Sequence, residues 1–409
     1  MFSSRLPPSL APNRLARAIE EARRGGDPIV DLTESNPTRA GFEYPDDLLA
    51  PLGDRRGLTY APRALGLEGA RRAVARDYER RNIMVGPERI VLTASTSDAY
   101  ALLFKVLCDP GDEVLVPRPS YPLFEHLTDL EGVVARPYDL EYHGTWRVDT
   151  ASLERACNER TRAVLLVSPN NPTGSFVTQD ELDEIAGICA GHDAALIADE
   201  VFADYELVEH AGATAGRVLA RHDVLAFSLG GLSKSVGLPQ VKLGWMAVAG
   251  PDAIVAEALG RLELVCDTYL SVSTPAQEAA AQLLVDGAVV REQIRARVTA
   301  NDRELIARAS AAPACRLLAP EGGWYAVIQV PTLMSEEDLV LDLLTKHRVL
   351  VHPGYFFDFA RESYLIVSLL TPAAVFQDGM SRVFERFNGM AEGLSASASV
   401  GGAPRESKE

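Results

Sequence analysis

Cysteine is scarce in this chain, with five residues among 409. The five are scattered and show no paired spacing of the kind that zinc ligands or redox motifs have: Cys108, Cys157, Cys189, Cys266 and Cys315. A disulfide framework and a structural zinc site are therefore not expected. The seven histidines show no metal-ligand spacing either. Reduced thiols of this kind are typical of a cytoplasmic protein, which is the location that we expect.

Basic residues are outnumbered, with 40 Lys and Arg against 57 Asp and Glu and a net charge of −17. This balance argues against nucleic acid or an anionic membrane surface as a partner. No apolar run approaches the roughly 18 residues of a membrane span, and the N-terminal residues MFSSRLPP lack the apolar core of a signal peptide. The composition, 47% hydrophobic and 24% charged, is that of a globular protein. The length suffices for one large and one small domain.

Lys234 lies in a segment of small residues, SLGGLSKSVGLP at 228–239, directly after the apolar run 224–227. An amine held away from water loses its charge more readily and can then attack an aldehyde. The alternative is a surface lysine in a flexible loop, with an ordinary pKa near 10.4. Lys234 by itself does not decide between the two.

Two apolar runs upstream of Lys234 end in polar groups. The run 163–166 leads into Ser168-Pro169-Asn170-Asn171-Pro172-Thr173-Gly174, and the run 194–198 leads into Asp199-Glu200. Each run reads as a buried strand, and open α/β sheets bind ligands at the carboxyl ends of their strands. A carboxylate, an amide and a lysine on neighbouring strand ends together predict a cofactor site.

Short apolar runs alternate with helical patterns from about residue 68 to 290, which predicts an α/β fold with a mainly parallel, doubly wound sheet. The expected strands include residues 90–92, 114–116, 164–166, 196–198 and 225–227. A helix is expected at 12–25, a long helix that could link two domains at 288–311, and a last helix near 373–388. We expect an N-terminal segment at 1–45, a large cofactor-binding domain at 46–290 and a small C-terminal domain at 291–390. The polar tail 391–409 is expected to be disordered.

The motifs N-P-T-G at 171–174, D-E at 199–200, S-K at 233–234, G-L-P at 237–239 and L-G-W at 243–245 occur in a characteristic order. In this order the chain resembles, over most of its length, the fold-type I pyridoxal-phosphate enzymes of the aminotransferase class I/II family. The resemblance implies a three-layer large domain with a seven-stranded sheet and a small α/β domain on which the N-terminal segment folds. It also implies pyridoxal 5'-phosphate held by Lys234 as a Schiff base, and a homodimer with shared active sites.

The reaction that the resemblance implies is transamination between an amine or amino acid and an oxo acid. β- or γ-Elimination from an amino acid is an alternative, because the same family hosts both reactions. A non-catalytic cofactor-binding or scaffold protein is a further alternative, against which the set Lys234, Asp199 and Asn171 argues.

The family's site residues carry over to matching positions of this sequence. Asp199 would keep the pyridine nitrogen protonated, Asn171 would donate to the ring oxygen, and Tyr121 would stack on the ring. The phosphate would be held by a strand-to-helix turn and by the residue before the lysine, that is by Ser95, Thr96, Ser97 and Ser233. Tyr60 resembles the tyrosine that reaches the phosphate of the partner subunit. For several of these residues a plain structural role is the alternative: a helix cap for Ser95, a turn for Tyr121, a core aromatic for Tyr60.

Four positions depart from the family pattern. Lys242 replaces an arginine that grips phosphate, Gly231 replaces a serine, and Phe202 replaces a tyrosine that donates to the ring oxygen. The loss at Phe202 should raise the pKa of the bound chromophore. Ile366 stands where relatives hold the substrate carboxylate with an arginine.

An isoleucine cannot pair with a carboxylate, so either another cation takes over or the substrate lacks that group. Arg39 and Arg361 are the candidate cations, although a surface position would explain both. Ser35 and Asn36, in the same N-terminal segment as Arg39, are further expected substrate contacts.

Overall fold

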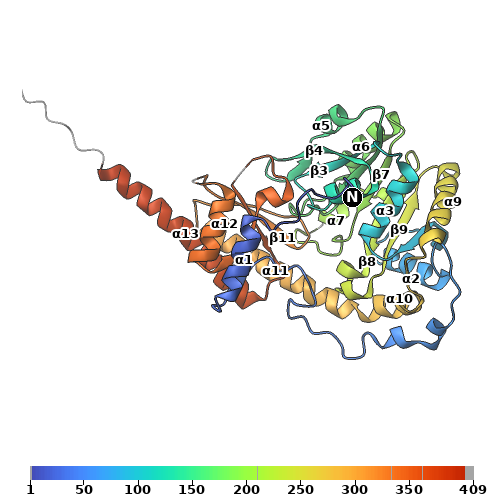
Figure 1. Ribbon diagram of the computed structural model, residues 1–409, viewed down its shortest axis with the longest axis horizontal. Coiled ribbons are helices and arrows are strands. Elements are labelled where there is room, and N and C mark those ends of the chain that lie inside the picture. Colours follow the sequence, from blue (N-terminus) through green and yellow to red (C-terminus); the bar gives the residue numbers. More distant parts are fainter. Residues whose placement is uncertain (1, 210, 333, 362, 401–409) are drawn as a thin grey trace, which may run out of the picture.

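The computed structural model describes residues 2–209, 211–332, 334–361 and 363–400, and Figure 1 shows a large domain and a small domain side by side. The large domain is built on an eight-stranded sheet of order β2-β9-β8-β7-β6-β3-β4-β5. The five strands β4, β3, β6, β7 and β8 run parallel, while β2, β9 and β5 pair antiparallel. The strands are β2 (Ile90–Thr93), β3 (Glu113–Arg118), β4 (Val134–Tyr142), β5 (Trp146–Val148), β6 (Thr161–Val167), β7 (Ala195–Asp199), β8 (Ala226–Gly231) and β9 (Gly244–Ala249).

The predicted α/β class and mainly parallel sheet are confirmed, and each of the five expected runs lies at least in part in a strand. The short β5 pairs only with β4, and it brings the sheet to eight strands where the resemblance implied seven. The central strands are apolar on both faces, as parallel strands between two helical layers must be. In β6, for example, Ala163 and Leu165 pack on one side of the sheet, and Val164 and Leu166 on the other.

Helices cover both faces of this sheet. α3 (Thr96–Leu107), α4 (Phe124–Glu131) and α9 (Asp252–Tyr269) pack on one face, and α5 (Thr150–Ala156) and α6 (Gln179–Gly191) on the other. The remaining helices of this domain are α2 (Glu68–Glu79), α7 (Ala211–Thr214), α8 (Leu232–Ser235) and α10 (Thr274–Asp286). The 3-10 helices of the chain are η1 (Ala50–Gly53), η2 (Arg55–Leu58), η3 (Pro87–Arg89), η4 (Val218–Ala220), η5 (Pro239–Val241) and η6 (Gly354–Phe357).

The small domain holds an antiparallel sheet of order β10-β11-β14-β13. Its strands are β10 (Arg316–Leu318), β11 (Tyr325–Gln329), β14 (Tyr364–Ser368) and β13 (His352–Pro353), and α12 (Glu336–Lys346) packs beside them. The N-terminal segment joins this domain, because β1 (Val30–Asp31) pairs with β12 (Val349–Leu350) and α1 (Arg14–Arg24) contacts α12. The exact domain boundaries stay a prediction.

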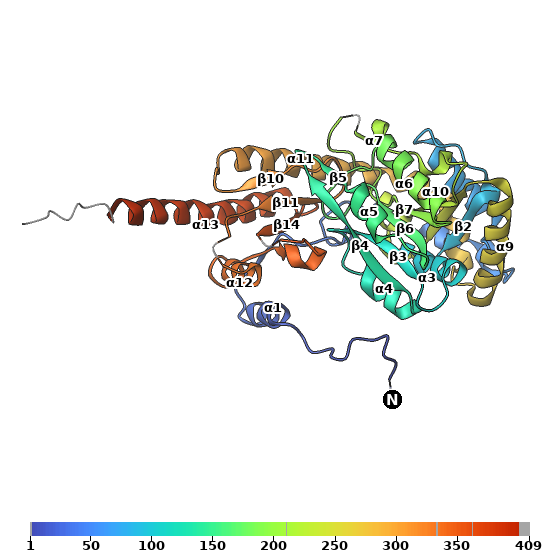
Figure 2. The ribbon, with the colours of Figure 1, turned by 90° about the horizontal axis from the view of Figure 1, so that it is seen from above.

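Two long helices shape the molecule. α11 (Ala288–Ser310) runs from α10 to the small domain, and α13 (Ala373–Val400) extends beyond the body in both views (Figures 1 and 2). α13 continues past residue 391, where the disordered tail was expected to begin, and 401–409 lie outside the described residues. Among the described residues we find no helix with the length and apolar character that a membrane crossing needs.

Candidate functional site

The carboxyl ends of β6, β7 and β8 lie next to one another in the sheet. Val167 pairs with Asp199, and Asp199 pairs with Leu229, so the segments that follow these strands start from one edge. The Asn170–Gly174 turn, the Asp199–Tyr205 segment and the short helix α8 with Lys234 all leave from there. The structure thus brings Asn171, Asp199 and Lys234 to one edge of the sheet, as the sequence predicted.

The amine of Lys234 lies above two aromatic rings. Its Nζ is 4.9 Å from the ring centre of Trp324 and 5.6 Å from that of Phe202. Among the described residues none makes a hydrogen bond to this amine. Burial lowers the pKa of Lys234 to about 8, while the negative charge of Asp199 acts in the opposite direction. The amine is therefore a better nucleophile and base near neutral pH than an ordinary lysine.

Asp199 is the last residue of β7 and its carboxylate is fixed by two donors. The hydroxyl of Tyr100 donates to one oxygen over 3.1 Å, and the backbone N–H of Val201 donates to the other over 3.1 Å. Burial raises the pKa of Asp199 to about 6, and the two hydrogen bonds and Lys234 lower it. Tyr100 was not predicted as a site residue, although it lies on α3, five residues after Ser95.

Asn171 is buried, and its Oδ1 has no hydrogen-bond partner among the described residues. The preceding residue, Asn170, holds the turn in place. Its Nδ2 donates to the carbonyl of Pro119 over 3.1 Å and to Thr173 over 2.9 Å, and its Oδ1 accepts from Ser120 over 3.1 Å. Asn170 therefore ties the turn that carries Asn171 to the segment that carries Tyr121, a positioning role that the motif alone did not reveal.

Close backbone packing brings the start of α3 to the end of β8. A Cβ on Gly244 would lie 3.0 Å from the carbonyl carbon of Ser95, and a Cβ on Gly231 would lie 3.2 Å from the Cα of Gly244. Ser95 caps α3 by accepting from the N–H of Asp98 over 3.1 Å. Thr96 and Ser97 open the helix with N–H groups that have no intrahelical acceptor. These N–H groups and the helix dipole make this turn suited to an anion.

Two further expected phosphate ligands lie beyond the strand end. Ser233 is in the single turn α8, one residue before the lysine, and it is partly buried. Lys242 has an exposed side chain and a left-handed backbone with φ of 58°, between η5 and β9. The structure records no ion pair for Lys242 with a described residue.

Phe202 is 5% exposed and faces the amine, so no hydroxyl occupies this place. Its ring meets that of Trp324 edge-on, with the ring centres 5.2 Å apart. Tyr205, which does not fit the family pattern, is fully buried and points to the backbone of Lys234. Trp324 is the residue that the sequence did not single out as a site residue, because only the fold brings the segment before β11 next to Lys234.

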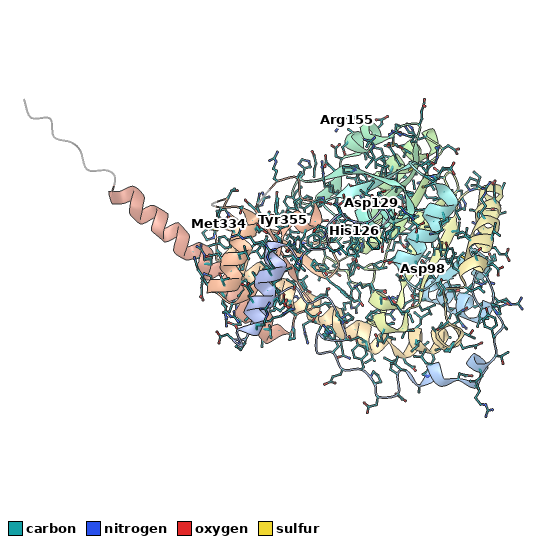
Figure 3. All side chains as sticks on the ribbon, viewed as in Figure 1. Asp98, His126, Asp129, Arg155, Met334 and Tyr355 are labelled. Carbon is teal, nitrogen blue, oxygen red and sulfur yellow. The ribbon has the colours of Figure 1, made fainter. Side chains whose placement is uncertain are left out.

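Tyr121 is 37% exposed and close enough to Asp199 for that charge to help raise its pKa, after the larger effect of burial. It lines a cavity of about 440 Å³ together with Arg118, Phe124, Tyr355 and Asp358. Arg118 donates to Asp139 from Nε and Nη2, over 2.8 and 2.6 Å. This cavity lies between the two domains, because residues of β3 and α4 line it on one side and residues 355–360 on the other. Of its lining residues, Figure 3 labels Tyr355.

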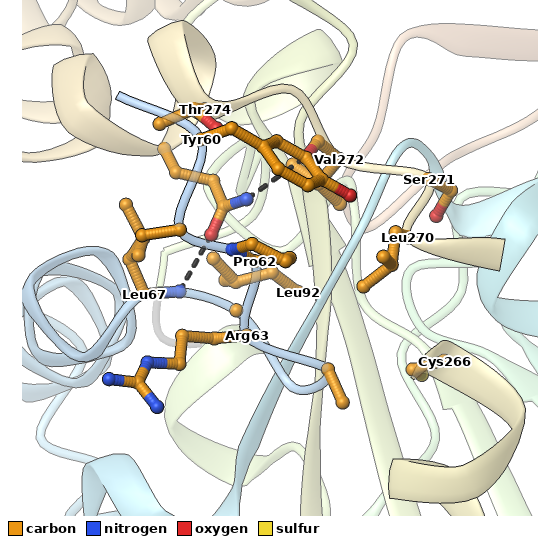
Figure 4. Close-up of a pocket in the computed structure, with 14 residues that line it drawn as sticks. Tyr60, Pro62, Arg63, Leu67, Leu92, Cys266, Leu270, Ser271, Val272 and Thr274 are labelled. Atoms are coloured by element: carbon orange, nitrogen blue, oxygen red, sulfur yellow. Dashed lines mark hydrogen bonds between the residues drawn. The ribbon is translucent and has the colours of Figure 1, made fainter. Parts of the chain in front are cut away.

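Tyr60 has no recorded contact with Lys234, Asp199 or Asn171 among the described residues of its own chain. Its side chain is 77% exposed, and it covers a small cavity of about 40 Å³ beside Val272 and Thr274 (Figure 4). Below it, Gln277 accepts from the N–H of Leu67 and donates to the carbonyl of Val272.

Ile366 is fully buried in β14, where it pairs with Val327 and His352. It packs in an apolar cluster with Trp146, Leu318, Val327 and Phe357. Ser368, two residues further and on the same face of the strand, donates to the carbonyl of Glu34 over 2.6 Å. This face of β14 therefore contacts the N-terminal segment at Ser368, and no cation of β14 replaces the missing arginine.

Arg39 and Arg361 are both exposed, and the structure records no ion pair of either with a described residue. Ser35 and Asn36 are partly buried. Ser35 lies near Tyr325 of β11, whose pKa burial raises and Ser35 lowers, and Asn36 accepts from Thr38 over 2.8 Å. Of the expected substrate contacts, Ser35 and Ile366 thus lie on or against the small-domain sheet, while the two arginines lie at the surface.

Comparisons with known proteins agree on the family. The model of the family "Aminotransferase class I and II" matches residues 28–377. The alanine aminotransferase of Mycobacterium tuberculosis is 30% identical over 359 residues, covering 83% of this chain and 81% of the relative. The glutamate-pyruvate aminotransferase of Escherichia coli is 28% identical over 362 residues, covering 83% and 86%.

Solved structures share the fold. The alanine aminotransferase of Pyrococcus furiosus superposes with a TM-score of 0.85 at 24% identity, over 95% of this chain and all of that one. An aspartate aminotransferase of Thermus thermophilus, a double mutant, gives a TM-score of 0.80 at 24% identity, over 94% and 99%. The fold-type I architecture of this chain follows from these superpositions.

A buried amine facing a carboxylate at the strand ends, the family match over most of the length and the shared architecture lead to one conclusion. The chain belongs to the aminotransferase class I and II family and is a pyridoxal-phosphate-dependent aminotransferase acting on amino and oxo acids.

Proposed function

We propose that Lys234 is the residue that binds pyridoxal phosphate, and that this enzyme moves an amino group from a small amino acid to a 2-oxo acid. The observation that carries the assignment is the position of Lys234 Nζ over the rings of Trp324 and Phe202, where burial lowers its pKa to about 8 and the Asp199 charge acts on it. Burial is the larger cause of this lowered pKa. A nucleophilic amine needs that property.

The surrounding groups fit the cofactor. We propose that the α3 turn with Ser95, Thr96 and Ser97, helped by Ser233 and Lys242, holds the phosphate. Asp199 would pair with the ring nitrogen, which agrees with a carboxylate kept rigid by Tyr100 and Val201. The side chain of Asn171 is buried beside these strand ends, and its amide Nδ2 would donate to an oxygen of the cofactor ring.

The bound cofactor supplies an electron sink for the substrate carbon that carries the amino group. Lys234 Nζ, once free, takes the proton from that carbon as a general base and returns it one step later as an acid. Asp199 would keep the nitrogen of the cofactor ring protonated. Tyr121 would cover a face of that ring by stacking. Phe202 and Trp324, both buried, keep water away from the amine.

The names of the relatives suggest the first substrates to test, alanine and glutamate with pyruvate and 2-oxoglutarate. The apolar surroundings of Ile366 favour a substrate α-carboxylate that is held elsewhere than in the family. We leave Arg39 and Arg361 as candidates and add Arg118, which lines the cavity that Tyr121 also lines.

We further propose a homodimer in the cytoplasm. Tyr60, Leu58 and Tyr269 are apolar side chains that are 77%, 79% and 56% exposed, which a partner subunit would cover. Tyr60 would then reach the phosphate of the partner's cofactor. The five cysteines are free, which agrees with a reducing compartment.

The test is an absorbance scan of the cofactor-loaded enzyme against a panel of donors without acceptor. A transaminase changes its spectrum once, with one equivalent of oxo product per site. Steady release of ammonia and oxo acid without acceptor would instead indicate elimination, and a spectrum that no amine changes would contradict both reactions.

A further inference from the structure

The amine of Lys234 lies over two aromatic faces. Nζ is 4.9 Å from the ring centre of Trp324 and 5.6 Å from that of Phe202. The two rings meet at 67° with centres 5.2 Å apart, and they are 1% and 5% exposed. They come from different domains, Phe202 from the segment after β7 and Trp324 from the residue before β11.

Aromatic faces carry partial negative charge and attract a cation within about 6 Å, most strongly where water is absent. This attraction favours the ammonium form of Lys234, whereas burial disfavours it. Asp199 is the charged group that acts on the amine from β7. The nearby titratable hydroxyls are engaged elsewhere, because Tyr100 donates to Asp199 and Tyr205 donates to the carbonyl of Lys234.

We propose that Trp324 and Phe202 form an aromatic cradle that stabilises and positions the protonated amine of Lys234 during the proton transfer of transamination. The inference rests on the proposed role of Lys234. Trp324 is a positioning residue in this scheme, because it acts through the lysine.

The cradle acts on Lys234 after the substrate amine has displaced Lys234 from the cofactor. The C–H bond of the substrate then breaks, its electron pair would be taken up by the electron sink that the bound cofactor supplies, and the proton forms a new N–H bond at Nζ. The resulting ammonium has no hydrogen-bond acceptor among the described residues, so the ring faces are what holds it until the proton is returned. Because the two rings also exclude water, the proton stays at Nζ instead of exchanging with solvent.

A purely packing role for Trp324 predicts the opposite effect on the amine. Replacing Trp324 by leucine leaves space that water can enter, and hydration raises the pKa of a buried amine. Removal of a cation–π partner instead lowers that pKa. The direction of the change therefore separates the two roles.

The experiment measures the pKa of Lys234 by competitive labelling of the full chain with acetic anhydride between pH 6 and 11, followed by mass spectrometry of the Lys234 peptide. The protein is stripped of cofactor and its ability to be reloaded is checked. We expect Trp324→Leu to lower the pKa by about 0.5 to 1.5, the change that corresponds to a desolvated cation–π contact. Trp324→Phe, which keeps a smaller aromatic face, should lower it less.

Trp245→Leu is the matched control, because Trp245 is a 3% exposed tryptophan of the same core cluster for which no contact with the amine is recorded. It should leave the pKa of Lys234 unchanged although it destabilises the fold. In the loaded enzyme, the pH profile of the first half-reaction should move in the same direction as the labelling pKa in the Trp324 variants. If the pKa of Lys234 rises or stays the same in Trp324→Leu, the aromatic cradle is refuted. If Trp324→Leu does not fold, an unchanged pKa of Lys234 in Trp324→Phe refutes it.

Failure of the proposed function would look different. If Lys234→Ala still forms the cofactor absorbance band, then the lysine assignment is wrong whatever Trp324 does. If Lys234→Ala loses that band while Trp324→Leu leaves the pKa of Lys234 unchanged, the proposed function is supported and the aromatic cradle is refuted.

Discussion

The hydroxyl of Tyr205 donates to the backbone carbonyl of Lys234 over 2.5 Å. The same ring packs edge-on against Trp324, with ring centres 5.1 Å apart, so Tyr205 supports both the lysine and one of the rings below its amine. A residue outside the family pattern thus fixes the backbone of the proposed cofactor-binding lysine.

Tyr205→Phe should lower the stability of the protein by about 1 to 3 kcal/mol, because it leaves the carbonyl of Lys234 without a buried donor. Cofactor loading should slow as the lysine becomes less well placed. Chemical denaturation and stopped-flow loading measure the two effects. Tyr364→Phe is the control, since Tyr364 is a partly buried tyrosine outside this contact. Equal stability and loading of Tyr205→Phe and the parent protein would contradict this role.

The rate at which cofactor-free protein takes up pyridoxal phosphate should rise with pH and level off well below the ordinary lysine pKa of about 10.4. The reason is that only the neutral amine attacks, and burial lowers the pKa of Lys234 to about 8. Absorbance at the chromophore band follows the uptake. Lys234→Ala should abolish both the band and turnover, and near-normal multiple turnover in that variant would refute the assignment.

Phe202→Tyr should lower the pKa of the bound chromophore, because the new hydroxyl would donate to the ionised ring oxygen and favour the ionised form. A spectral titration of the loaded enzyme measures it. The parent chain should accordingly titrate higher than relatives that have the tyrosine. No movement, or movement upward, would mean that Phe202 does not face the ring.

Lys242→Ala should weaken cofactor binding, since a phosphate would lose a cation, while Lys242→Arg should be tolerated or should tighten it through a bidentate contact. Equilibrium dialysis of pyridoxal phosphate gives both affinities. Lys346→Ala serves as a control, because Lys346 pairs with Asp342 on the small domain. If the alanine variant of Lys242 binds as tightly as the parent, the phosphate site has been placed wrongly.

Arg39→Ala, Arg361→Ala and Arg118→Ala together decide what replaces the arginine at Ile366. Leaving a substrate carboxylate buried and unpaired would cost several kcal/mol. Replacing the arginine that holds it should therefore lower the activity of the enzyme toward α-amino acids by orders of magnitude. Each variant is assayed with α-amino acids and with amines that lack a carboxylate.

Loss of α-amino-acid activity in one variant identifies the displaced cation. Activity toward carboxylate-free amines alone would instead show that the substrate lacks the group. A triple variant replaces Arg39, Arg361 and Arg118 by alanine. Full activity of this variant toward aspartate, glutamate or alanine would contradict the proposal that one of these arginines holds the substrate carboxylate.

The sequence by itself determined the fold class and the strand ends. Apolar runs such as 163–166 and 194–198 have to be buried on both faces, and the polar groups that follow them, Asn171 and Asp199, necessarily lie at the same edge of a parallel sheet. Helix α11 was also predictable, within a residue, from its pattern alone. The missing hydroxyl at Phe202 and the missing charge at Ile366 could be located by counting residues from the neighbouring motifs.

Only the tertiary structure decided what surrounds the lysine. Trp324 is 90 residues from Lys234 in sequence, and no local pattern marks a contact that arises when the small domain packs on the large one. The same holds for Tyr100 on Asp199 and for Asn170, whose hydrogen bonds join segments 50 residues apart. Local propensity fixes strands and helices because it acts between neighbours, whereas the burial, aromatic contacts and pKa of a site depend on segments that only packing brings together.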